Sequence, residues 1–174
     1  MTEPFDDQPK ATKPASLPSS GANAEIPAKR IAPALVGWRE WAWLPSLAST
    51  PIRAKIDTGA ASSSVHASQV VFGYDTLGQP TVSFELHLHE DRESTISVSD
   101  HRVSDTRVVR SSSGHWASRP VIKVPMQLGG LTFEIDVTLA SRDPMEYRML
   151  IGRSALRKRF YVDTSTSFRL GEPQ

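Results

Sequence analysis

The chain has 174 residues and no cysteine, which excludes disulfide bonds and thiolate chemistry. Its formal net charge is only +1, so charge gives no general reason to expect binding to nucleic acid. No apolar run approaches the roughly 20 residues that span a bilayer, and the chain does not start like a secretory signal. These absences predict a cytoplasmic protein that has no membrane partner and no direct nucleic-acid partner.

The first 34 residues are rich in Pro, Ala, Ser and charged residues and contain few large apolar side chains. Such a segment cannot bury enough surface to offset the entropy lost on ordering. We therefore expect a disordered tail over residues 1–34 and a single folded domain over residues 35–174.

Alternation of polar and apolar residues predicts a domain built of short strands. Strands are expected at 36–44, 52–56, 62–65, 81–89, 96–98, 103–109, 121–128, 131–139, 149–151, 160–162 and 167–170. Residues 66–69 are expected to form a turn or short helix, and Ser154 to cap a helix over 155–159. Gly129-Gly130 predicts the turn of a hairpin. Together these features favour an all-β fold, a small closed β-barrel with one short helix near the C-terminus.

The segment Ala54–Ala60 carries the clearest chemical signal. An apolar strand ends in Asp57-Thr58-Gly59, and a buried carboxylate costs several kcal/mol unless it is hydrogen-bonded or shares a proton. Two such turns face to face would form a pair of carboxylates that cannot both ionise. One carboxylate would then act as general base on water, and the other would donate a hydrogen bond to the scissile carbonyl. The alternative is an ordinary turn or cap.

The Ala54–Ala60 segment resembles the active-site sequence of retropepsin-like aspartic peptidases, and Met149–Arg153 resembles their second signature. Further segments are similar to one bacterial family commonly labelled "ATP-dependent zinc protease". They are Val36–Glu40, Leu44-Pro45, Val109–Ser112 and Arg119–Val121. The resemblance covers Leu35 to Leu170.

The resemblance implies a retropepsin-like aspartic endopeptidase with Asp57, Thr58 and Gly59 as catalytic residues. A single motif in so short a chain implies a homodimer. It also implies a flap, a hairpin that closes over the substrate, for which we assign Val108–Val121. Substrate-binding residues are then expected in the flap and around the catalytic turn: Ala60, Arg110, Ser111, Ser112, Gly114, Arg119 and Arg153.

Family members are associated with a ligase that adds glutamates to a ribosomal protein, which implies a glutamate-rich peptide or a glutamylated ribosomal protein as substrate. Arg110 and Arg119 are suited to bind an acidic peptide, and the alternative is that they brace the fold. For Arg153 the bracing role is favoured. Many members carry Arg at the position of Ala61, so this chain departs from the family pattern there. Any substrate preference that this position sets in the family is not carried over to this chain.

The sequence gives no support for the "zinc" or "ATP" in that label. It contains neither a metalloprotease spacing nor a phosphate-binding loop, so we expect no metal and no cofactor. Glu85, His87 and His89 share a strand face and are either metal ligands or a solvated surface. His66 and His115 are either substrate contacts or structural. Besides a metallopeptidase, the alternative function is a non-catalytic module of the same fold that binds acidic peptides.

Overall fold

The computed structural model of the protein describes residues 32–89, 94–110, 116–141 and 146–172. Within these ranges the chain forms nine strands and one helix: β1 (Ala34–Trp43), β2 (Ile52–Asp57), β3 (Ser63–Tyr74), β4 (Pro80–His87), β5 (Thr95–Arg110), β6 (Trp116–Leu128), β7 (Leu131–Ala140), β8 (Met149–Gly152), α1 (Arg153–Leu156) and β9 (Phe160–Ser167). The predicted tail lies almost entirely outside the described residues and stays a prediction.

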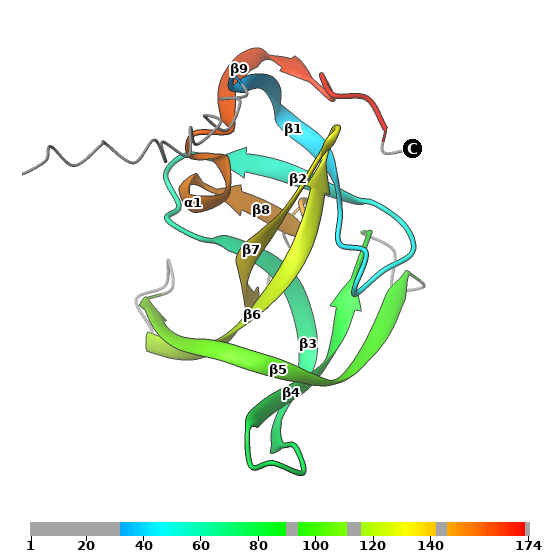
Figure 1. Ribbon diagram of the computed structural model, residues 1–174, viewed down its shortest axis with the longest axis vertical. Coiled ribbons are helices and arrows are strands. Elements are labelled where there is room, and N and C mark those ends of the chain that lie inside the picture. Colours follow the sequence, from blue (N-terminus) through cyan, green and yellow to red (C-terminus); the bar gives the residue numbers. More distant parts are fainter. Residues whose placement is uncertain (1–31, 90–93, 111–115, 142–145, 173–174) are drawn as a thin grey trace, which may run out of the picture. The chain divides into compact units, whose positions relative to one another are not determined.

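The strands form one mixed sheet that closes on itself in two places. Its order is β4-β5-β6-β7-β3-β8-β2-β1-β9, and the additional pairings β3–β4 and β1–β6 join distant parts of that order. Figure 1 shows β6 and β7 crossing the molecule between β1 and β9 at one end and β4 and β5 at the other. The predicted all-β, barrel-like fold with one short helix is confirmed.

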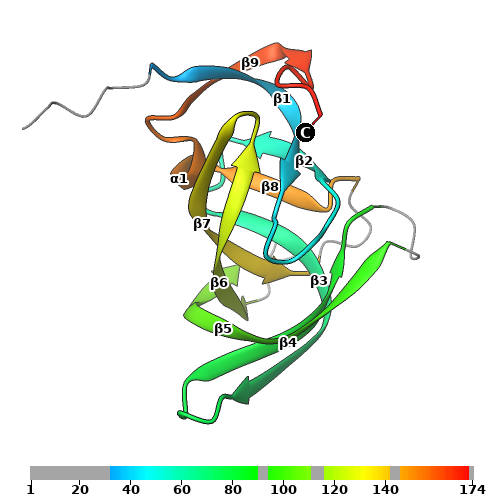
Figure 2. The same ribbon diagram turned by 45° about the vertical axis from the view of Figure 1, so that its right-hand side comes forward.

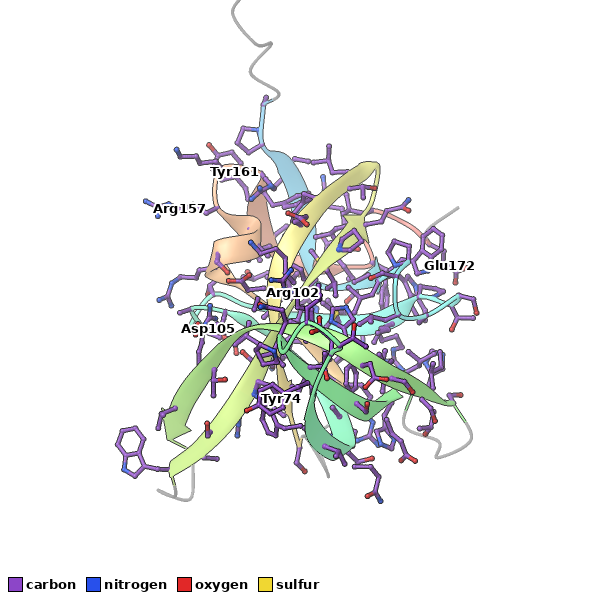
Figure 3. The ribbon with its side chains drawn as sticks, turned by 60° about the horizontal axis from the view of Figure 1, so that its bottom comes forward. Tyr74, Arg102, Asp105, Arg157, Tyr161 and Glu172 are labelled. Atoms are coloured by element: carbon purple, nitrogen blue, oxygen red, sulfur yellow. The ribbon has the colours of Figure 1, made fainter. Side chains whose placement is uncertain are left out.

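The core follows from the period-two alternation of these strands. In β2, for example, Ile52, Ala54 and Ile56 are buried, whereas the residues between them face outward. The inner faces of the strands supply one continuous cluster of apolar side chains, mostly aliphatic, with Phe84 and Phe160 among them. The outer ends of β3 and β4 project beyond this cluster as a two-stranded ribbon (Figure 2). Tyr74, at the end of that ribbon, is 78% exposed (Figure 3).

Two predicted hairpins are present. β6 and β7 pair up to Leu128 and Leu131 across the Gly129-Gly130 turn, where Gly129 has a φ of +57°. That angle is readily available only to glycine. β5 and β6 form the second hairpin, with Arg110 paired to Trp116. The tip of this hairpin, which falls within the predicted flap Val108–Val121, lies outside the described residues.

Three local predictions were wrong. Residues 66–69 continue β3, because β7, β8 and β4 pair with this strand on its two sides; the deviation there is a bulge with Gln69 at φ +50°. The helix begins at Arg153 after Gly152, and no side chain caps it. Residues 168–170 are not a strand, because Phe168, at φ +51°, turns the chain after β9.

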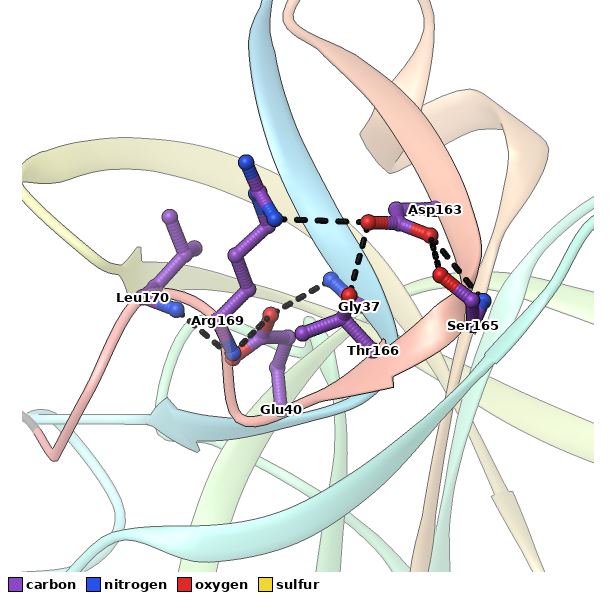
Figure 4. Close-up of polar contacts among 7 residues, drawn as sticks. All are labelled: Gly37, Glu40, Asp163, Ser165, Thr166, Arg169 and Leu170. Carbon is purple, nitrogen blue, oxygen red and sulfur yellow. Dashed lines mark hydrogen bonds and ion pairs between the residues drawn. The ribbon is translucent and has the colours of Figure 1, made fainter.

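The C-terminal segment is instead fastened to β1 by a buried carboxylate (Figure 4). Glu40 is fully buried and accepts hydrogen bonds from the backbone N–H groups of Gly37, Arg169 and Leu170 at 2.6, 3.0 and 3.3 Å. Three donors offset the cost of burying this carboxylate. Beside it, hydrogen bonds from Ser165 and Thr166 lower the pKa of Asp163 to about 2.

Candidate active site

The Asp57 turn is held by hydrogen bonds to its own backbone. Asp57 ends β2, and its Oδ1 accepts hydrogen bonds from the N–H groups of Gly59 and Ala60, both at 3.0 Å. The Ala60 N–H also lies 3.3 Å from the Asp57 carbonyl oxygen. These bonds fix the carboxylate in one orientation, with its side chain half-buried at the end of the strand. One carboxylate oxygen, Oδ2, is left out of this turn network.

The second signature, Met149–Arg153, lies directly beside this turn. β8 runs parallel to β2, and Gly152 pairs with Asp57. A Cβ at Gly152 would lie 2.5 Å from the carbonyl carbon and oxygen of Ser62, so only glycine fits between β8 and the chain that follows the turn. The Gly152 N–H donates to Ser63 Oγ at 3.2 Å. The two sequence signatures therefore form one structural unit.

Arg153 closes this unit from the helix side. Its NH1 group donates to the carbonyl oxygens of Thr58 and Gly59 at 2.9 and 2.7 Å, and its backbone N–H donates to Ala60 O at 2.9 Å. Ser154 N–H similarly donates to Ala61 O at 3.1 Å. The first N–H groups of α1 thus find partners in the Asp57 turn and Ala61, which explains why no side-chain cap is needed. The bracing contacts of Arg153 are therefore hydrogen bonds from its guanidinium to backbone carbonyl groups of the Asp57 turn.

Two open pockets meet at Thr58. The first, of about 680 Å³, is lined by Trp38, Lys55, Ile56, Asp57, Thr58, Glu146, Tyr147 and Leu150. The second, of about 510 Å³, is lined by Thr58, Ala61, Arg153, Ser154, Leu156, Arg157, Phe160 and Val162. We call them the Asp57 pocket and the α1 pocket. The Asp57 pocket combines two carboxylates and a lysine with aromatic walls, whereas the α1 pocket is an apolar hollow with two arginines among its lining residues.

Among the other predicted substrate contacts, the structure describes the side chains of Ala60 and Arg119, and neither lines these two pockets. Arg119 is half-buried on β6, where it pairs with Arg107, and it lines neither pocket. Only the backbone of Arg110 is described, at the end of β5. Ser111, Ser112, Gly114 and His115 lie outside the described residues, and their roles stay predictions.

His87, at the end of β4, belongs to a hydrogen-bond network on another part of the barrel. Ser68 Oγ lies 2.7 Å from His87 Nε2 and donates to Glu85 Oε2 at 3.1 Å. The ring of His87 lies against that of buried His66, with centroids 4.4 Å apart and the ring planes tilted by 33°. Among the described residues, no three or more His, Asp or Glu side chains are arranged to hold a metal ion. The contacts of His66 and His87 in this network are those expected for structural residues.

Sequence reasoning missed most of the Asp57 pocket. Lys55 could have been found, because it lies two residues before Asp57 and strand alternation places both on one face. The aromatic walls, Trp38 and Tyr147, belong to neither of the two signatures of the sequence. These two rings meet edge to face with centroids 6.1 Å apart. Only the tertiary fold brings them together, so no local pattern predicts their contact.

A barrel of this topology, with Asp-Thr-Gly at the end of one strand and Ile-Gly-Arg at the end of its parallel neighbour, has the retropepsin-like fold. A family model described as "Retropepsin-like aspartic endopeptidase RimB" matches residues 35–172. The chain belongs to this RimB-like family. No helix within the described ranges is long and apolar enough to cross a membrane.

Relatives of the chain include longer proteins whose name refers to a ligase and not to a peptidase. Proteins from Shewanella pealeana and Desulfotalea psychrophila, each named "Probable alpha-L-glutamate ligase", are 41% and 38% identical to it over 138 and 144 residues. The matches cover 79% and 82% of this chain, which spans only about 30% of each relative. A crystal structure of a Legionella pneumophila protein of unknown function matches 79% of this chain and 98% of its own, at 26% identity and a TM-score of 0.66.

Proposed function

We propose that the protein is an aspartic endopeptidase whose active site forms between two copies of the chain. The observation that carries this proposal is the Asp57 turn, which lies beside Gly152 and Arg153 and opens onto a pocket. A carboxylate fixed by two backbone N–H groups, with its second oxygen outside that network, is well placed to act on water.

In the proposed reaction, the ionised Asp57 of one copy removes a proton from water as the water oxygen bonds to the scissile carbonyl carbon. The protonated Asp57 of the second copy donates a hydrogen bond to the carbonyl oxygen. Collapse of the tetrahedral intermediate breaks the C–N bond, and a carboxyl proton passes to the amine leaving group. Because two adjacent carboxylates cannot both ionise readily, the pair holds one acid and one base.

The second copy is proposed to dock where the two pockets meet. Each chain supplies one Asp57, so the chemistry is incomplete without a partner. Thr58, Ala61 and Arg153 are exposed there, and the α1 pocket offers apolar surface for burial. Arg157 and Tyr161 project from the same end of the barrel (Figure 3), and Tyr161 is 64% exposed.

We propose an acidic, glutamate-rich peptide as substrate, with a glutamylated ribosomal protein as the candidate. The name of the relatives supports the acidic class, because a segment similar to this chain forms part of proteins named as probable α-L-glutamate ligases. A ligase that adds glutamate makes a peptide with a run of carboxylates, and a peptidase joined to it would encounter that product. The β5–β6 hairpin, with Val108 and Trp116 exposed, is the proposed flap.

The test is cleavage of a glutamate-rich peptide by wild type and by Asp57→Asn. The amide keeps the shape of the side chain but cannot take the proton from water, so we expect activity to fall by roughly 10²–10⁴-fold. A chelator should leave wild-type activity unchanged. Equal cleavage by both proteins would contradict the mechanism, and loss of activity on chelation would favour a metallopeptidase. Binding of the peptide without cleavage by wild type would favour the non-catalytic module.

A further inference from the structure

Strand alternation places a row of cations on the outer face of β2, next to the catalytic carboxylate. Arg53, Lys55 and Asp57 are the residues of β2 that do not face the core. Successive residues on one face of a strand are roughly 6.6 Å apart. Lys55 is therefore the outward-facing neighbour of Asp57 on this strand, and both line the Asp57 pocket.

The Lys55 side chain is available to a ligand. It is exposed, and among the described residues no carboxylate lies close enough to form an ion pair with it. Its ammonium group is thus solvated at the edge of a pocket that two carboxylates, Asp57 and Glu146, also line. A bound acidic side chain would gain a charge-assisted hydrogen bond there.

The walls of the pocket are held in place by contacts behind it. The guanidinium of Arg39 lies 4.6 Å from the Trp38 ring centroid, and its NH1 donates to the Tyr147 hydroxyl at 3.1 Å. Its Nε also donates to Ser167 Oγ at 3.0 Å. These contacts fix the two aromatic rings, so the pocket can hold the aliphatic part of a side chain while its end reaches Lys55.

We infer that Lys55 is a specificity-determining residue that selects an acidic side chain at a substrate position next to the scissile bond. This inference rests on the proposed function. An acidic side chain near the Asp57 pair would otherwise be repelled by the charge that the pair carries. The positive charge of Lys55, which lies on the same strand as Asp57, offsets that repulsion. Arg53 adds a second positive charge further along β2. A glutamine of the same shape gains neither interaction.

Glu146 lines the same pocket with the opposite charge. Its carboxylate opposes binding of an acidic side chain and therefore limits the preference that Lys55 creates. Removing each charge in turn should move the selectivity in opposite directions. This opposition separates a charge effect from a general disturbance of the pocket, which would move both variants the same way.

The experiment compares two peptides that differ only by Glu or Gln beside the cleaved bond. The Glu-to-Gln ratio of kcat/KM should fall roughly fivefold in Lys55→Met, the upper end for an exposed ion pair. It should be restored in Lys55→Arg and should rise in Glu146→Gln. Lys123→Met is the matched control, because Lys123 is an exposed β6 lysine that does not line the Asp57 pocket; its ratio should equal that of wild type.

The outcomes separate this inference from the proposed function. If wild type cleaves and Lys55→Met keeps the wild-type ratio, Lys55 is not the selector, although the Asp57 mechanism stands. If wild type cleaves neither peptide, the proposed function fails. The Glu-to-Gln ratio of the peptides' Kd values then decides: a ratio that rises in Lys55→Met supports the selector, because the Glu peptide loses affinity, and an unchanged ratio overturns it.

Discussion

Arg153 and Asp57 act on the same short turn from opposite sides. The carboxylate binds the N–H groups of Gly59 and Ala60, and the guanidinium binds the carbonyl groups of Thr58 and Gly59. Both directions of the peptide dipoles in the turn are therefore satisfied. Arg153 does not touch the reacting atoms in this arrangement, so we assign it a positioning role.

Arg153→Lys tests that role. A lysine keeps the charge but lacks the planar fork of the guanidinium, so the turn should be less well fixed and kcat should fall about tenfold, the loss expected for a charged hydrogen bond. KM should change little, because substrate contacts are kept. The control is Arg102→Lys on β5 (Figure 3), whose guanidinium contacts Gln79 instead. A change in KM alone would indicate substrate binding by Arg153.

At the level of residues, the sequence predicted the parts of the site that are contiguous in the chain. Asp57, Thr58 and Gly59 stand in one motif, and β2 delivers them as expected. Arg119 was expected to bind substrate because it lies in the predicted flap hairpin, but it lines neither pocket. The aromatic walls come from β1 and from the segment before β8, and no local pattern links residues so far apart.

Among the elements, the contact of β8 with the chain entering β3 is the tightest part of the site. Ala at position 152 would place a methyl group against the Ser62 backbone, which cannot move as a side chain can. We expect Gly152→Ala to lower the free energy of unfolding by between about 1 and 3 kcal/mol, measured by urea denaturation.

Gly130→Ala is the matched control for that prediction. A Cβ at Gly130 meets nothing within 4 Å, and the φ of this residue is not in the left-handed region. Its stability should stay within about 0.5 kcal/mol of wild type. If the two variants are equally stable, the close approach of Gly152 to Ser62 is not a structural requirement.

Elements were predictable where side-chain alternation and turn residues agree. The Gly129-Gly130 hairpin satisfies both conditions, and its strands were located to within a few residues. Ser154 has the chemistry of a helix cap, but the helix begins one residue earlier, at Arg153, and the Ser154 N–H donates to the Ala61 carbonyl oxygen. Residues 66–69 contain no strong strand pattern, and their pairing with β7 at His66 and with β4 at Ala67 and Ser68 decides their conformation.

At the level of the whole molecule, the number and length of the strands predicted a small barrel, whereas the strand order could not be predicted. The parallel pairs β2–β8 and β3–β7 join segments far apart in the chain. The first of these pairs brings the two signatures together. Their joint position was expected only through the resemblance to a known family.

The central claim is that each active site takes one Asp57 from each of two chains, and subunit mixing tests it most directly. Wild type is diluted with a ninefold excess of Asp57→Asn and allowed to re-equilibrate, and peptide cleavage per wild-type chain is measured. If pairs form at random and mixed pairs are inactive, activity per wild-type chain should fall to about one tenth. Unchanged activity per wild-type chain would show that a single chain is sufficient and would contradict the account.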